Sequence, residues 1–296
     1  IYHMKKSRFA AVAAIMAVML FCTACSSTPE ASSVTETPSS TASSASAAPE
    51  STSPASSEAG SDVSSEAAEP SESPVETPPG TLVESTRVED SYFDDAVFIG
   101  DSVSLKLNRY ASEQRKSNAN FMGKAQFLTA GSMGSGNALQ PVSDESIHPM
   151  YNGEKLSLAD SVAKSGAKKV YIMLGMNDLA PYGVDGAVEN MQKLITTILE
   201  KTPDAKIYIQ SATPLVKAKN ISTHKLNNTN MAAYNEKLAA LCAEQGYYFV
   251  DVASVVSDSE GNLIQSYCSD PDNMGIHFTD EGCQVWVDYL YTHTAQ

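Results

Sequence analysis

Five short, nearly continuous apolar runs alternate with longer amphipathic segments in the C-terminal two thirds of the chain. The runs cover residues 96–100, 125–130, 168–174, 206–211 and 247–252. Strands that are covered on both faces have this appearance, because neither face meets water. Helical patterns lie between the runs, near 103–113, 156–165, 186–201 and 227–245, with a last one near 279–293. Residues 86–296 are therefore predicted to form one three-layer α/β domain with a mostly parallel five-stranded sheet.

The chain before residue 86 has a composition that cannot form a core. Residues 26–85 contain ten acidic residues, eight of the fourteen prolines and no Lys or Arg, in a background of Ser, Thr and Ala. Such a segment buries too little apolar surface to fold. We expect a disordered linker, and a flexible chain of this length reaches roughly 40 Å. It either holds the domain away from a lipid surface or acts as a plain spacer.

Residues 1–25 have the organisation of an export signal. Lys5, Lys6 and Arg8 precede the apolar run 9–21, and small residues follow. The apolar run is short for a membrane-spanning helix, which needs ~20 residues. The segment LFCTAC resembles a bacterial lipobox, which implies cleavage before Cys25 and lipid attachment to its sulfur. This predicts a lipid anchor on the extracellular face of the bacterial cell membrane; an ordinary secretory signal or an uncleaved anchor is the alternative.

The folded part is acidic, which excludes one large class of partners. Residues 86–296 contain 17 Lys or Arg and 25 Asp or Glu. Nucleic-acid binding requires a positive surface, so we expect no nucleic-acid partner. The folded part also contains no HExxH, no paired Cys motif, no GxGxxG after a strand and no GxxxxGK[ST]. We therefore expect neither a metal nor a cofactor.

Polar residues follow the predicted strands at the points where parallel strands gather reactive groups. They are the segments 100–102 (Gly-Asp-Ser), 131–137, 175–178 (Gly-Met-Asn-Asp) and His277. A hydroxyl, an imidazole and hydrogen-bond donors are what acyl transfer requires. Taken singly, each has a plainer interpretation: Gly-Asp-Ser as a helix cap, Asn177-Asp178 as a turn, and His277 as a surface residue.

In combination, the segments VFIGDSVSL, MLGMNDL and GIHFTDEG resemble the sequence blocks of the GDSL-type, or SGNH, hydrolase family. The resemblance covers about residues 92–293. It implies a flavodoxin-like three-layer fold and serine esterase chemistry. It makes Ser102 the nucleophile and His277 the general base. It also implies an oxyanion hole formed by the Ser102 N–H, a glycine N–H and the Asn177 side-chain amide; we choose Gly131 as the glycine, with Gly134 as the rival.

The sequence departs from the family at one position. The family usually has an Asp three residues before the His to orient the imidazole, but this chain has Met274, which cannot stabilise an imidazolium. The nearest carboxylates are Asp270, Asp272 and Asp280, and Asp280 suits a helix cap. We predict that a longer loop brings Asp272 to the histidine. A Ser-His dyad held by a backbone carbonyl, or a domain without catalysis, are the alternatives.

Two further expectations concern the surroundings of the predicted site. Cys268 and Cys283 flank the His277 segment, so they either form a disulfide or remain buried thiols, whereas Cys242 is predicted to lie in the core. In addition, the side chains of Tyr151, Met176 and Tyr182 are candidates for lining a substrate pocket beside Asn177.

The predicted function is that of an exported, lipid-anchored serine esterase. Its substrate would be an acylated small molecule or glycan, with short acyl groups such as acetyl favoured by location and family analogy. The alternative, motivated by Met274, is a surface binding lipoprotein that keeps the fold without turnover.

Overall fold

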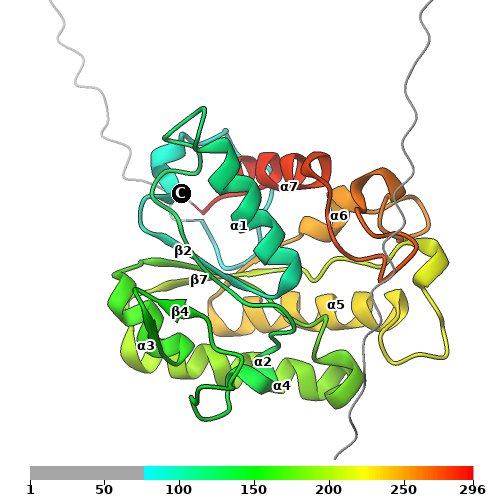
Figure 1. The fold of residues 1–296 in the computed structure, drawn as a ribbon, viewed down its shortest axis with the longest axis horizontal. Helices are drawn as coiled ribbons and strands as arrows, with labels where there is room; N and C mark the ends of the chain where they lie inside the picture. The colour runs from blue at the N-terminus through cyan, green and yellow to red at the C-terminus, as the bar shows by residue number, and fades with distance from the viewer. Residues whose placement is uncertain (1–76, 296) are drawn as a thin grey trace, which may run out of the picture. The chain divides into compact units, whose positions relative to one another are not determined.

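The structure, a computed structural model, describes residues 77–295 (Figure 1). The predicted signal segment, Cys25 and almost all of the predicted linker lie outside these residues. The central sheet has six parallel strands in the order β1-β8-β7-β6-β2-β3. Their bounds are β1 Gly80–Thr81, β2 Ala96–Gly100, β3 Gln126–Thr129, β6 Lys169–Met173, β7 Lys206–Gln210 and β8 Tyr248–Val250. A separate antiparallel pair joins β4 Met150–Tyr151 and β5 Glu154–Lys155.

Helices cover both faces of the sheet, which confirms the predicted three-layer α/β fold. Figure 1 shows α1, α6 and α7 on one side and α3, α4 and α5 on the other, and the buried apolar residues form two matching clusters. The helices are α1 Ser102–Gln114, α2 Ser135–Ala138, α3 Leu158–Ser165, α4 Leu179–Lys201, α5 Asn228–Gln245, α6 Val252–Val256 and α7 Asp280–Thr292. Short 3-10 helices are η1 Asp90–Phe93, η2 Lys217–Lys219 and η3 Gln265–Tyr267.

The sheet has one strand more than the five predicted, and this strand lies within the segment assigned to the linker. Gly80 and Thr81 pair with Tyr248 and Phe249 of β8. Leu82 is buried, and the Ser85 N–H donates to the Thr292 carbonyl at 2.6 Å. The folded domain therefore includes residues before 86. A two-residue edge strand is too short to produce a periodic pattern. The composition of the surrounding segment therefore led to its assignment as linker.

Five aromatic rings stack across the sheet and fix its register. Phe127, Phe98, Tyr171, Tyr208 and Tyr248 come from five adjacent strands, with successive ring centroids 5.3, 4.6, 4.4 and 5.0 Å apart. Each neighbouring pair is also a register pair of the ladder. A slip of one residue would move a ring to the opposite face of the sheet. The ladder thus aligns the carboxyl ends of the strands that carry the site.

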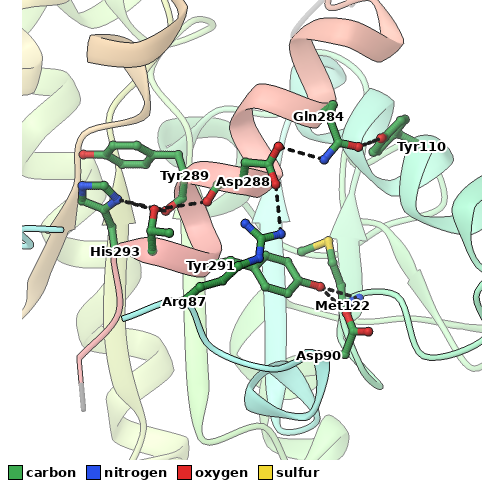
Figure 2. Close-up of polar contacts among 10 residues, drawn as sticks. Arg87, Asp90, Tyr110, Met122, Gln284, Asp288, Tyr289, Tyr291 and His293 are labelled. Atoms are coloured by element: carbon green, nitrogen blue, oxygen red, sulfur yellow. Dashed lines mark hydrogen bonds and ion pairs between the residues drawn. The ribbon is translucent and has the colours of Figure 1, made fainter. Parts of the chain in front are cut away.

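Side-chain contacts tie α1, which begins at Ser102, to α7 (Figure 2). The Tyr110 hydroxyl of α1 donates to Gln284 of α7, whose amide donates to Asp288 at 3.0 Å. Arg87 donates to the other oxygen of Asp288 at 2.9 Å. Asp90 also accepts hydrogen bonds from the Tyr291 hydroxyl and from the backbone N–H of Met122, the latter at 3.0 Å. These contacts connect α1, and the segments before and after it, to α7.

Cys242, Cys268 and Cys283 are free, buried thiols. The alternative of a Cys268–Cys283 disulfide is therefore not observed, and Cys242 lies in the core as predicted. Burial raises the pKa of Cys268 to about 11 and that of Cys283 to about 12.

Within residues 77–295, no helix combines the length and hydrophobicity needed to cross a bilayer. The same residues contain no group of three His, Cys, Asp or Glu side chains suited to a metal ion.

Candidate active site

Ser102 lies at the carboxyl edge of the sheet, where the strand order reverses. The chain proceeds from β2 to β3 on one side and later from β6 outward on the other, and ligands bind at such a switch point. Gly100 permits the tight turn, because a Cβ there would lie 2.0 Å from the Ser104 hydroxyl oxygen. Asp101 caps α1 by accepting the Val103 N–H at 2.9 Å. Ser102 is thus the first residue of the helix.

His277 lies between Ser102 and a carboxylate. Its Nε2 is 2.9 Å from Ser102 Oγ, and its Nδ1 is 2.7 Å from Asp270 Oδ2. With the Nδ1 hydrogen donated to the carboxylate, Nε2 is free to accept the serine proton. A nucleophile, a base and a group that orients the base therefore lie within hydrogen-bond distance of one another.

The orienting carboxylate belongs to Asp270, so the prediction of Asp272 was wrong. Asp272 contributes only its backbone carbonyl, which accepts a hydrogen bond from Lys219 Nζ at 2.8 Å. Asp270 is at the base of the loop, where the Ser269 N–H donates to the His277 carbonyl at 2.7 Å. That pairing brings the two ends of the loop together. Met274 lies near the tip with half of its surface exposed.

Asp270 is held as an anion by several donors. Burial opposes its ionisation, but hydrogen bonds from the His277 ring and from the backbone outweigh burial, so the pKa of Asp270 lies below its usual value. Oδ1 accepts the backbone N–H groups of Ile276 at 3.1 Å and His277 at 3.0 Å. The Cys268 thiol is 3.4 Å from the same oxygen and donates to it. The loop backbone itself therefore completes the carboxylate's contacts.

The predicted oxyanion donors lie on the loops after β2, β3 and β6. Within residues 77–295, the backbone N–H groups of Ser102 and Gly131 have no hydrogen-bond acceptor. The N–H of Gly134 donates to Asn137 Oδ1 at 2.8 Å. The geometry therefore favours Gly131 over Gly134 as the glycine donor.

Asn177 joins two of these loops. Its side-chain nitrogen donates to Asp101 Oδ2 at 3.2 Å and to the Met133 carbonyl at 3.1 Å. Asp101 is buried, and burial raises its pKa to about 7. The amide of Asn177 is thus oriented by the aspartate that precedes Ser102.

Asp178 is a supporting residue whose role the sequence did not reveal. Its carboxylate is fully buried and accepts the N–H groups of Ser135 and Gly136, each at 2.9 Å. It therefore fixes the loop that carries Gly131 and Met133 to the loop that carries Asn177. Sequence alone suggested a local turn, whereas the carboxylate bonds are made to residues more than 40 positions earlier. The sequence signal that could have indicated this role was the glycine-rich loop, because its many backbone N–H groups need an acceptor.

The three predicted pocket residues have different surroundings. Tyr182 is 45% exposed and its ring packs over Gly136. Met176 is buried in the core, and the Tyr151 hydroxyl donates to Gln126 on the edge strand β3. Met176 also lines a small cavity whose wall includes Asp101 and Val103, the two neighbours of Ser102 in the chain.

Comparison with known proteins agrees with the geometry. Residues 98–285 match the GDSL-like Lipase/Acylhydrolase family. A GDSL-like lipase from Bacteroides thetaiotaomicron is 18% identical with a TM-score of 0.50, covering 67% of this chain and 86% of its own. A carbohydrate acetylesterase family member from Sinorhizobium meliloti is 16% identical with a TM-score of 0.44, covering 67% and 95%. Among curated proteins no relative was found. The family match spans more than half of the sequence, and the chain belongs to the GDSL-like lipase/acylhydrolase family of serine ester hydrolases.

Proposed function

We propose that this protein is an exported serine esterase that removes short acyl groups, acetyl above all, from carbohydrate or cell-wall glycan. The observation that carries the proposal is the hydrogen-bonded series Ser102–His277–Asp270, together with N–H groups of Ser102 and Gly131 that have no acceptor among residues 77–295. Asp270 provides the carboxylate that the family usually has at the position of Met274. The reason for considering a binding protein without turnover therefore no longer applies.

The first half of the reaction forms an acyl-enzyme. Ser102 Oγ attacks the ester carbonyl while His277 Nε2 takes the hydroxyl proton. The carbonyl oxygen becomes an oxyanion that accepts the N–H groups of Ser102 and Gly131. A hydrogen of the Asn177 amide is shared between Met133 and the oxyanion. The bond to the sugar oxygen then breaks, and His277 returns the proton to that oxygen, so the deacylated sugar leaves neutral.

The second half repeats these steps with water. His277 takes a proton from a water molecule, whose oxygen attacks the acyl carbon and forms the oxyanion again. The bond from that carbon to Ser102 Oγ breaks, and Oγ recovers the proton from His277. Acetic acid leaves and releases its proton to solvent, and the free enzyme is restored. Asp270 stabilises the imidazolium in both halves without itself taking a proton.

The exposure of the site supports a short acyl chain. A long acyl chain needs an enclosed apolar pocket. The hollow of about 420 Å³ between α5 and α6 is not lined by Ser102 or His277. Ser102 and His277 instead lie at a surface edge with His277 partly exposed. Such a site suits a small acyl group on a bulky carrier.

The location is part of the proposal. A lipid on Cys25 and a linker over residues 26–85 would hold the domain outside the cell membrane, within reach of wall polymers. Intact-mass measurement of the protein from membranes tests the anchor: a Cys25→Ser variant should lose the lipid mass and leave the membrane fraction.

The activity is tested with the purified domain and its Ser102→Ala variant. We expect hydrolysis of p-nitrophenyl acetate to exceed hydrolysis of the octanoate ester, and acetate to be released from O-acetylated oligosaccharides. Both activities should disappear in Ser102→Ala. Absence of any Ser102-dependent hydrolysis would contradict the proposal.

A further inference from the structure

Two large apolar side chains are exposed on the loops that build the active site. Within residues 77–295, six such side chains are exposed: Val83, Val142, Met150, Tyr182, Ile221 and Met274. Tyr182 comes one helical turn after Asp178, on the oxyanion side. Met274 comes three residues before His277, on the base side. An exposed apolar residue by itself is ordinary, but a pair on the two loops beside one nucleophile calls for a reason.

The ring of Tyr182 is held in position although 45% of the residue is exposed. Gly183 has φ 68° and ψ −177°, which breaks α4 directly after its first turn. The ring lies so close to Gly136 that a Cβ there would be 2.3 Å from a ring carbon. Asp178 in turn holds the Gly136 N–H. The ring is therefore a fixed surface continuous with the oxyanion loop.

Met274 lies on a loop that is also fixed. The backbone of its neighbour Gly275 has φ +71° and packs against the side chains of Val216 and Lys219. The Gly275 carbonyl accepts the Val216 N–H at 2.9 Å. Because Asp270 orients His277, the Met274 side chain is not needed for the proton transfer, and half of the residue is exposed to solvent.

We propose that Tyr182 and Met274 are specificity-determining residues that bind sugar rings on either side of Ser102, so that the preferred substrate is an acylated oligosaccharide. This inference rests on the proposed function. A pyranose ring presents C–H groups on its faces and hydroxyls at its edge. The C–H groups pack on the electron-rich face of an aromatic ring or on a polarisable thioether, while the hydroxyls remain in water. Tyrosine provides this contact with little loss of conformational entropy.

The spacing of the two residues points to more than one sugar. Tyr182 lies at the start of a helix on the α3–α5 face of the sheet, and Met274 lies over the segment that follows β7. Ser102 begins α1 on the opposite face, at the carboxyl end of β2, which lies between β6 and β3 in the sheet. A substrate with its ester at Ser102 and further rings at Tyr182 and Met274 would extend along this edge.

The test compares catalytic efficiency on two substrates. Wild type, Tyr182→Ala, Tyr182→Phe and Met274→Ala are assayed on an O-acetylated xylo-tetraose and on p-nitrophenyl acetate. We expect Tyr182→Ala to lower kcat/KM on the tetraose at least tenfold more than on the nitrophenyl ester, chiefly through KM. Met274→Ala should show a smaller differential, about threefold, and Tyr182→Phe should retain most of the selectivity because the ring remains. Met150→Ala, an exposed residue on β4, is the matched control and should show no differential.

The outcomes separate the inference from the proposed function. Losses in equal proportion on both substrates, or no loss in either variant, would overturn the inference alone. Ser102-dependent hydrolysis of the nitrophenyl ester without acetate release from any acetylated sugar would instead overturn the glycan function. A second experiment varies the length of the sugar. KM of wild type should fall as the substrate is lengthened from one ring to four, and the fall in KM should be smaller in Tyr182→Ala.

Discussion

Two carboxylates flank Ser102, and the protein holds them in opposite ways. Asp101 is buried, and burial raises its pKa to about 7. Asp270 is partly exposed and accepts bonds from the His277 ring and from backbone N–H groups, and these lower its pKa despite the burial it does have. Asp101 orients the side-chain amide of Asn177, which belongs to the predicted oxyanion hole, and Asp270 orients His277, the base.

The difference reflects how the two sides are built. The oxyanion side is fixed by buried side chains, Asp101 and Asp178, that connect loops far apart in the sequence. The base side is one loop whose backbone folds around Asp270. A buried framework tolerates little change in spacing, whereas a surface loop accepts additional residues as long as its two ends meet.

The largest effect is expected for Asp270→Asn. The amide leaves His277 without a carboxylate to stabilise the imidazolium, and the comparable change in a serine protease lowers kcat by about 10⁴. We expect kcat on p-nitrophenyl acetate to fall by about three orders of magnitude or more. Asp272→Asn is the matched control and should stay within about threefold of wild type, because its side chain is not bonded to the histidine. A large loss of kcat in Asp272→Asn with little change in Asp270→Asn would show that Asp272 orients His277.

Asp101→Asn is expected to have an intermediate effect. Asparagine has one acceptor oxygen where Asp101 uses two, so it cannot satisfy both the Val103 N–H and the Asn177 amide. Loss of an oxyanion donor costs about 10²–10³ in kcat, and misorientation of Asn177 should cost part of that, about tenfold to a hundredfold. The measurement is kcat with short esters. An unchanged kcat would show that the Asp101–Asn177 bond does not matter for turnover.

The same two residues should give opposite dependences of stability on pH. Between about pH 4 and 7 the folded protein keeps a proton on Asp101 that the unfolded chain releases, so unfolding free energy falls as pH rises, by up to about 4 kcal/mol. For Asp270 the unfolded chain binds the proton first as pH falls, so stability is lost on acidification below about pH 4. Urea unfolding of wild type and both Asn variants across pH 3–8 measures the differences. If the contributions of Asp101 and Asp270 to the unfolding free energy changed with pH in the same direction, the contrast between the two carboxylates would be contradicted.

Asp178→Ala should act mainly on stability. It leaves the buried N–H groups of Ser135 and Gly136 without an acceptor, which we expect to cost about 3 kcal/mol of unfolding free energy. Asp185→Ala on the same helix removes an exposed carboxylate paired with Lys237 and should cost about 0.5 kcal/mol or less. Equal losses in the two variants would mean that Asp178 is not a framework residue.

The smallest effect is expected when the usual family aspartate is restored. In Asp270→Asn with Met274→Asp, the new carboxylate lies at the exposed tip of the loop, not at its base. The double variant should remain within about threefold of Asp270→Asn in kcat. Recovery to near wild-type kcat would show that the loop rearranges freely.

The sequence predicted what depends on local periodicity and on motifs at strand ends. The three layers and five strands follow from apolar runs and from the geometry of a parallel sheet, whereas the pairing of Ser102 with His277 was implied by the resemblance to the GDSL-type family. The edge strand at Gly80 was missed because two residues carry no period. Asp270 was missed because the position of a carboxylate in a loop depends on which backbone groups pair, here Ser269 with His277. Asp178 was missed because its partners are distant in sequence.

The central claim is that Ser102 is a nucleophile activated by His277 and Asp270. Reaction with a fluorophosphonate followed by intact-mass and peptide mass measurement tests it most directly. We expect one adduct on the peptide that contains Ser102. It should be absent in Ser102→Ala and form far more slowly in His277→Ala and Asp270→Asn. No adduct in wild type, or an adduct on another residue that persists in Ser102→Ala, would contradict it.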